Sequence, residues 1–208
     1  MQNKTAQGKL LQAQFDPHFL FNTINNLYAL SLLDPLKTRD VIERIKTVLN
    51  YIIDESQKSF VALSDEISLV ENYIQLEKLR YGKRLNVGYK TAGDPESVKI
   101  PPMILFFLVE NCFKHGSSLD AGTPWINIDV DANPEQIRLI VANSKPKSMV
   151  KTKMEDSAGR GLQNLKRRLE LIYTKHLYSL KIDNKEKSFT VNIELKKPEI
   201  ELGRETYR

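Results

Sequence analysis

Four polar side chains that suit phosphate chemistry end an otherwise apolar helical pattern. Helical spacing puts Glu110 and Lys114 on one face, and it likewise pairs Asn111 with His115. The amide oxygen of Asn111 suits a hard cation, and Lys114 and His115 can donate to phosphate oxygens. The spacing therefore fits a phosphate and Mg²⁺ site, and it fits equally a helix terminus that emerges into water with Gly116 as its C-cap.

Two glycines, Gly159 and Gly161, precede a predicted helix that starts near Leu162. Glycines at this place let backbone N–H groups approach an anion, and the helix N-terminus adds the positive end of its dipole. The polar loop before them, residues 143–157, has a length typical of functional lids. An ordinary helix-entry turn explains the same glycines as well.

A third candidate pair is His18 and Asn22, which lie four residues apart and so share one helical face beside an apolar stripe. A partly buried structural histidine explains this pattern too. Cys112 falls inside an apolar run, which favours a small buried residue over a nucleophile. His176 closes a late helix and receives no function.

Apolar spacing predicts the elements that must position these side chains. Helical spacing occurs at residues 10–30, 41–52, 64–80, 103–114 and 162–172. Alternation typical of strands occurs at residues 85–89, 126–130, 137–141, 178–182 and 189–193. This order predicts an α+β fold, in which an N-terminal helical hairpin is followed by helices on one face of a mixed sheet.

Composition narrows the class of protein. With 208 residues, 41% hydrophobic and 27% charged, the chain has ordinary globular composition, which excludes disordered and fibrous classes. The net charge of +5 comes from scattered residues and is weak evidence for nucleic acid. One cysteine allows no disulfide within the chain, which fits a reducing compartment. No stretch approaches the roughly 20 apolar residues that span a bilayer.

The motifs, taken in order, resemble one family. The sequence Pro-His-Phe-Leu-Phe-Asn at residues 17–22 resembles the phosphoacceptor motif of the LytS-type sensor histidine kinases. Residues 110–116 resemble the N-box of the wider GHKL ATP-binding fold, and residues 159–164 resemble its second glycine box. Residues 63–80 look like the segment that usually joins the two parts. The resemblance covers about residues 10–195.

The resemblance implies a role for each candidate residue. His18 would accept the γ-phosphoryl group of ATP, and Glu110 would belong to the catalytic hydrogen-bond network. Asn111 would hold Mg²⁺, and Lys114 and His115 would contact the phosphates. The implied cofactors are therefore ATP and Mg²⁺.

The resemblance also implies a nucleotide lid, with one departure at the adenine end. Gly159 and Gly161 would let the lid close over the nucleotide, and the cofactor-binding motif continues through Leu162 and Asn164. Many relatives carry Asp-x-Gly after the central strand, and that Asp accepts a hydrogen bond from the adenine amino group. This chain has Asn143 instead, which accepts without charge assistance.

Three functions remain open from the residues. The first is an active autokinase, and the second is a degenerate kinase that serves as an interaction module with weak or absent nucleotide binding. The third, another GHKL enzyme such as a chaperone-type ATPase, is disfavoured by the motif around His18.

The expected organisation has three parts. Residues 1–60 would form the helical dimerisation and phosphoacceptor segment, residues 61–197 the GHKL-type catalytic domain, and residues 198–208 a polar tail. The hairpin carries more apolar surface than two helices can bury, so we expect a homodimer through a four-helix bundle.

The resemblance also sets expectations for partners and location. The implied partner is a response regulator of the LytTR type, and no nucleic acid is expected. The first residues enter a helical pattern without a start signal, which suggests a piece of a longer protein. This part would be cytoplasmic, and an upstream segment would anchor the full-length protein in the bacterial inner membrane.

Overall fold

The computed structural model describes residues 17–116, 123–145 and 155–197. Its helices are α2 (Pro17–Leu33), α3 (Pro35–Asp54), α4 (Leu63–Tyr81), α5 (Ile104–Gly116) and α6 (Glu155–Ile172), with short 3₁₀ turns η1 (Glu55–Gln57) and η2 (Gly82–Arg84). Its strands are β1 (Val61–Ala62), β2 (Asn86–Gly93), β3 (Lys99–Ile100), β4 (Trp125–Asn133), β5 (Gln136–Ser144), β6 (Tyr178–Asn184) and β7 (Ser188–Lys196). The start of the first predicted helix and the predicted polar tail lie outside these residues.

Five strands form one mixed sheet in the order β2-β4-β5-β7-β6. β2 runs parallel to β4, and the other neighbours are antiparallel. The turn between β4 and β5 is held by Asn133, whose side-chain oxygen accepts from the N–H groups of Glu135 and Gln136 at 3.1 and 2.9 Å. The predicted mixed sheet is confirmed.

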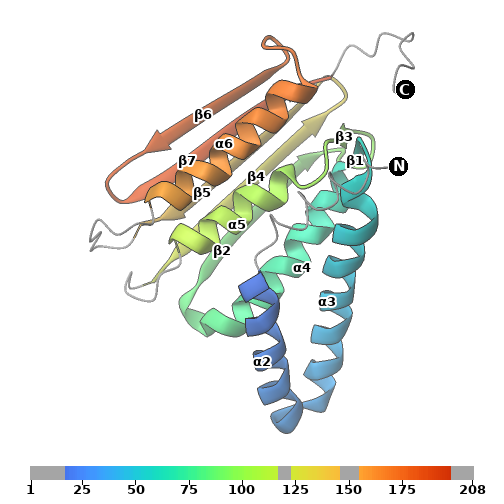
Figure 1. Cartoon of the computed structure of the whole chain (residues 1–208), viewed down its shortest axis with the longest axis vertical. Coiled ribbons are helices and arrows are strands. Elements are labelled where there is room, and N and C mark those ends of the chain that lie inside the picture. Colours follow the sequence, from blue (N-terminus) through green and yellow to red (C-terminus); the bar gives the residue numbers. More distant parts are fainter. Residues whose placement is uncertain (1–16, 117–122, 146–154, 198–208) are drawn as a thin grey trace.

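Alternate residues of the central strands point into the core, as the period of two requires. The buried residues are Ile126, Ile128, Val130 and Ala132 in β4 and Ile137, Leu139 and Val141 in β5. α5 packs against both strands and against α6, and α4 packs against α5. Figure 1 shows these helices gathered on one face of the sheet, so the predicted α+β architecture is confirmed.

The predicted helical hairpin is formed by α2 and α3, which extend from α4 away from the sheet (Figure 1). Asp34 is the one residue between the two helices, and its side chain accepts from the N–H of Lys37 at 3.1 Å as an N-cap. Pro35 occupies the first turn of α3, where its missing N–H costs nothing. Phe19 and Val48 are buried in the same core cluster as the sheet.

The structure corrects the sequence analysis at two places. α6 begins at Glu155, so Gly159 and Gly161 lie within its first turns and do not precede the helix. A small second sheet, in which β1 pairs with β3, was not predicted because two-residue strands show no alternation. Among the described residues, no helix is both long enough and apolar enough to span a bilayer.

Candidate functional site

The last two turns of α5 carry four of the predicted site residues. The carboxylate of Glu110 is buried, at 6% exposure, and its Oε1 lies 2.9 Å from Nζ of Lys114 one turn later. Asn111 is half-buried and Lys114 is exposed. His115 lies in the final turn, and its side chain is outside the described part of the structure. The helix therefore presents an amide and an ammonium beside a buried carboxylate.

The start of α5 is held by Glu66 of α4, whose carboxylate is fully buried. This carboxylate accepts hydrogen bonds from the N–H groups of Met103, Leu105 (3.0 Å) and Phe106 (3.4 Å), and from the hydroxyl of Tyr51 in α3. It thus satisfies N–H groups that the first turn of a helix leaves unpaired. Three elements, α3, α4 and α5, are joined through one side chain.

The charge state of Glu66 reflects two opposing effects. Burial raises the pKa of its carboxyl group, whereas the hydrogen bonds from Tyr51 and the backbone favour the charged form. The charge of Glu66 also acts on Arg168 of α6: burial lowers the pKa of the Arg168 guanidinium group, and the charge of Glu66 acts in the opposite direction. The four donors and this guanidinium group match an ionised carboxylate.

Tyr73 of α4 occupies the space between α4 and α5. Its ring packs on Phe106 and Phe113, at centroid distances of 5.0 and 5.4 Å, in edge-to-face geometry. Its hydroxyl donates to Oε1 of Glu77 at 2.9 Å, and Glu77 in turn pairs with Arg80 at 2.9 Å. This cluster aligns the two helices along their length.

The end of β5 supplies the predicted adenine residue. Asn143 is buried, at 2% exposure, and its Nδ2 donates to the carbonyl of Ser144 at 2.8 Å. On the neighbouring strands it stands opposite Ile126 and Phe189. The hydroxyl of Ser144 accepts from the N–H of Trp125 at 3.0 Å, which closes the β4–β5 ladder at this end.

The predicted nucleotide-site residues fall at the ends of three elements. The C-terminal end of α5, the C-terminal end of β5 and the start of α6 all lie at the same end of the sheet in Figure 1. In α6, Leu162 is half-buried and Asn164 is exposed. For Gly159 and Gly161 the structure gives helical backbone within the first turns of α6.

The structure places His18 on a different element, the first turn of α2. Its side chain is outside the described part of the structure. The next residue, Phe19, is buried at 6% exposure and packs on Tyr73 at a centroid distance of 4.8 Å. The first turn of α2 is therefore docked on α4 of the same chain.

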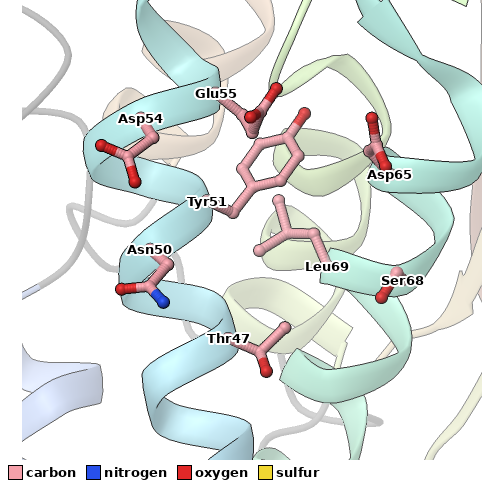
Figure 2. A pocket seen from close by; sticks show the side chains of 8 residues that line it. All are labelled: Thr47, Asn50, Tyr51, Asp54, Glu55, Asp65, Ser68 and Leu69. Carbon is pink, nitrogen blue, oxygen red and sulfur yellow. The ribbon is translucent and has the colours of Figure 1, made fainter.

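A hollow of about 230 Å³ lies elsewhere, between α3 and α4 (Figure 2). The carboxylates of Asp54, Glu55 and Asp65 line it, together with the side chain of Tyr51. Their negative charge would repel the phosphates of a nucleotide. Of its eight lining residues none is a predicted site residue, so this hollow does not fit the predicted ATP site.

Within the described ranges, no group of three or more His, Cys, Asp or Glu side chains could hold a metal ion.

Comparison with known proteins decides the family. A family model described as histidine kinase matches residues 6–85. The sensor histidine kinase/phosphatase LytS of Staphylococcus aureus (strain MRSA252) is 32% identical over 185 residues, covering 83% of this chain. The chain belongs to the histidine kinase family. The match to the family model takes in the hairpin and α4 of this histidine kinase and ends just before β2.

A second curated relative gives the same family, and this chain covers a limited share of both curated relatives. Sensor protein LytS of Staphylococcus epidermidis (strain ATCC 35984) is 31% identical over 141 residues, or 68% of this histidine kinase. The chain spans 24% and 31% of the lengths of these two curated relatives. A solved catalytic domain of histidine kinase ThkA is 16% identical, with a TM-score of 0.49, over 68% of this chain and 99% of that one.

Several residues that join the helices around the site were not predicted as site residues from the sequence. Three of them, Glu66, Tyr73 and Glu77, lie in the segment that joins the two family motifs. Their spacing does not indicate which residues they contact. Glu66 bonds to residues 37 to 40 positions later, which periodicity along the chain cannot reveal. The sequence did offer one signal that Glu66 has a structural role. An acidic residue on the buried face of an amphipathic helix must have hydrogen-bond or charge partners, because a buried carboxylate without them is costly.

Proposed function

We propose that this chain is the kinase core of a two-component sensor histidine kinase, which binds ATP, phosphorylates His18 and passes the phosphoryl group to a response regulator. The observation that carries the proposal is the convergence at one end of the sheet. The end of α5, the end of β5 and the start of α6 lie there (Figure 1), and together they would supply the residues that bind phosphate and adenine.

His18 would act as the nucleophile of the autokinase. A neutral imidazole offers a ring-nitrogen lone pair, which forms the N–P bond while the bond from the γ-phosphorus to the ADP oxygen breaks. Phosphoryl transfer demands positioning and charge neutralisation more than covalent chemistry, so the elements that orient α2 and α5 matter as much as the nucleophile.

The donor set on α5 fits a magnesium nucleotide. Asn111 would hold Mg²⁺ through its amide oxygen, with phosphate oxygens completing the coordination, and the ion would neutralise charge on the transferred group. Lys114 and His115 would donate to phosphate oxygens. Glu110 keeps the ammonium of Lys114 at the helix face through their 2.9 Å ion pair.

The first turns of α6 would close over the nucleotide. Gly159 and Gly161 lack side chains, so the nucleotide could approach the backbone of these turns closely. Leu162 and Asn164 belong to the same proposed cofactor-binding segment. Asn143 would face adenine at the end of β5, with its amide orientation fixed by the bond to Ser144.

The hairpin supports the proposal of a homodimer. Eight large apolar side chains on α2 and α3 are exposed: Phe21, Ile24, Tyr28, Leu32, Leu33, Leu36, Ile42 and Ile53. Surface of this kind is typical of helices that pack into a bundle with a second copy. We accordingly assign residues 1–60 to dimerisation and phosphoacceptance and residues 61–197 to ATP binding.

The remaining assignments concern the whole protein. The response regulator would be of the LytTR type, and the full-length sensor would be held at the bacterial inner membrane by a segment upstream of this one, with this part in the cytoplasm. The LytS relatives carry names that include sensor protein and sensor histidine kinase/phosphatase, which is consistent with this arrangement.

Labelling with ATP tests the proposal. The chain should retain label from γ-labelled ATP after denaturation and none from α-labelled ATP, and the labelling should require Mg²⁺. Asn111→Ala should abolish it, whereas Asn50→Ala, which removes an exposed amide on α3, should not. ATP at 100 times its Kd should stabilise the wild-type chain by about 2.7 kcal/mol. A chain with neither label nor stabilisation would be a degenerate kinase.

A further inference from the structure

Tyr73 contacts both helices that the proposed reaction must bring together. Its ring is buried, at 2% exposure, and lies 4.8 Å from Phe19 of α2. It lies 5.0 Å from Phe106 and 5.4 Å from Phe113 of α5, again between ring centroids. A single side chain of α4 therefore links α2 to α5.

These contacts are close in sequence to the proposed chemistry. Phe19 directly follows His18, the proposed acceptor. Phe113 directly precedes Lys114, the proposed phosphate contact. Phe106, Glu110 and Phe113 are spaced by four and three residues, so they share the face of α5 that meets Tyr73. A shift of the Tyr73 ring would move both ends of the proposed reaction.

The hydroxyl of Tyr73 adds a polar anchor to the ring contacts. It donates to Oε1 of Glu77, and Glu77 is held by Arg80. Burial raises the pKa of Tyr73, and the nearby carboxylates of Glu77 and Glu110 raise it further, so the hydroxyl stays a donor. The ring is thus fixed in orientation as well as in place.

The contact at Phe19 stands out on α2. Phe19 is 6% exposed, whereas Phe21, Ile24 and Tyr28 on the same helix are 58% to 70% exposed. The turn that carries His18 is therefore docked on Tyr73, and much of the remaining apolar surface of α2 is turned away from the chain. The docking site and the proposed dimer surface are different faces of one helix.

We infer that Tyr73 is a positioning residue for phosphoryl transfer, which fixes the acceptor turn of α2 relative to the nucleotide-binding end of α5. The inference rests on the proposed function. The ring of Tyr73 packs on Phe19, Phe106 and Phe113, and its hydroxyl donates to Glu77, so we assign the side chain a role in positioning and none in the chemistry itself. Misplacement of reacting groups by about 1 Å can slow a transfer about a hundredfold, so the loss of this side chain should act on rate.

The test compares Tyr73→Leu with Tyr73→Phe and with Tyr173→Leu in autophosphorylation. Tyr173 is buried to a similar degree, at 3% exposure, and lies after α6, so its loss reports damage to the core alone. Tyr73→Leu should lower the rate at saturating ATP at least about tenfold, with the KM for ATP within about twofold of wild type. Tyr73→Phe keeps the ring contacts and should retain most of the rate. Tyr173→Leu should leave both constants near wild type.

Hydrogen exchange supplies a readout that does not need kinase activity. Backbone amides at the start of α2 should exchange faster in Tyr73→Leu than in wild type, because the helix loses its docking contact. Phe19→Leu removes the same ring contact by changing its other partner, and it should give the same fall in rate. This variant therefore tests the inference even if Tyr73→Leu does not fold. The double variant should be no slower than either single variant.

The outcomes separate this inference from the proposed function. A wild-type chain that takes no label contradicts the proposed function, and the inference falls with it. Label on wild type together with an unchanged rate in Tyr73→Leu and Phe19→Leu contradicts the inference alone. A fall of equal size in Tyr173→Leu, or a raised KM at unchanged maximal rate, also overturns it.

Discussion

The hydroxyl of Tyr51 in α3 donates a hydrogen bond to the buried carboxylate of Glu66 in α4, and the same carboxylate caps the start of α5. The helical hairpin is thereby tied to the helix that carries Glu110 and Asn111. A displacement of α3 relative to α4 would strain this hydrogen bond. It would also disturb the hydrogen bonds that the same carboxylate accepts from the first turn of α5.

The first prediction concerns Glu66. Glu66→Gln keeps the size of the side chain but replaces one acceptor oxygen with an NH₂ group. Because this NH₂ group then faces the N–H and O–H groups that donated to the oxygen, at least one of those donors is left without an acceptor. We expect the free energy of unfolding to fall by about 2 kcal/mol, the usual cost of a buried unsatisfied group. Urea denaturation measures the change.

Glu71 provides the control for this prediction, because it is an exposed carboxylate on the same helix. Glu71→Gln should change the free energy of unfolding by no more than about 0.5 kcal/mol. Equal and small effects of the two substitutions would show that Glu66 does not anchor α5.

The second prediction concerns adenine recognition by Asn143. A carboxylate accepts a hydrogen bond about twice as strong as a neutral amide does, so Asn143→Asp should tighten ATP binding by about 1 kcal/mol. Binding of inorganic triphosphate should stay unchanged, because it has no adenine. Calorimetry at matched Mg²⁺ and salt measures both affinities.

Asn143→Asp should also lower stability. The substitution removes the Nδ2 donor that bonds to the Ser144 carbonyl at 2.8 Å, a loss of about 1 kcal/mol. Unchanged ATP affinity, or equal gains for ATP and triphosphate, would mean that Asn143 does not contact adenine.

The third prediction concerns Cys112. Burial raises the pKa of its thiol to about 12, and the side chain is 4% exposed. At pH 8 the reactive thiolate is therefore about one part in ten thousand, and the reagent has little access to it. A disulfide-exchange reagent should leave the native chain unmodified and modify it at once in concentrated guanidinium chloride. Rapid reaction of the native chain would contradict the burial of this face of α5.

The sequence allowed the sheet and the hairpin to be predicted because their signals are local. Ile126, Ile128 and Val130 alternate along one strand, and Asp34-Pro35 marks a turn by its own chemistry. The helix start at Glu155 was missed because Gly159 and Gly161 disfavour helix interiors by about 1 kcal/mol each, so they indicated a break.

The candidate site could be predicted only as separate motifs. The N-box residues and Asn143 are identified by family resemblance, and their convergence depends on the strand order, which no local pattern encodes. The links through Glu66 and Tyr73 are tertiary contacts between distant segments. Helical periodicity predicts that these residues lie on the buried face of their helix. It does not predict which residues of other elements they contact there.

The fourth prediction, and the most direct test of the central claim, is the position of the phosphoryl group after incubation with γ-labelled ATP and Mg²⁺. The label on wild type should be acid-labile and alkali-stable, as expected for a phosphohistidine. It should vanish in His18→Ala and persist in His176→Ala, which removes an exposed histidine beyond α6. Undiminished label on His18→Ala would contradict the assignment of His18 as the acceptor.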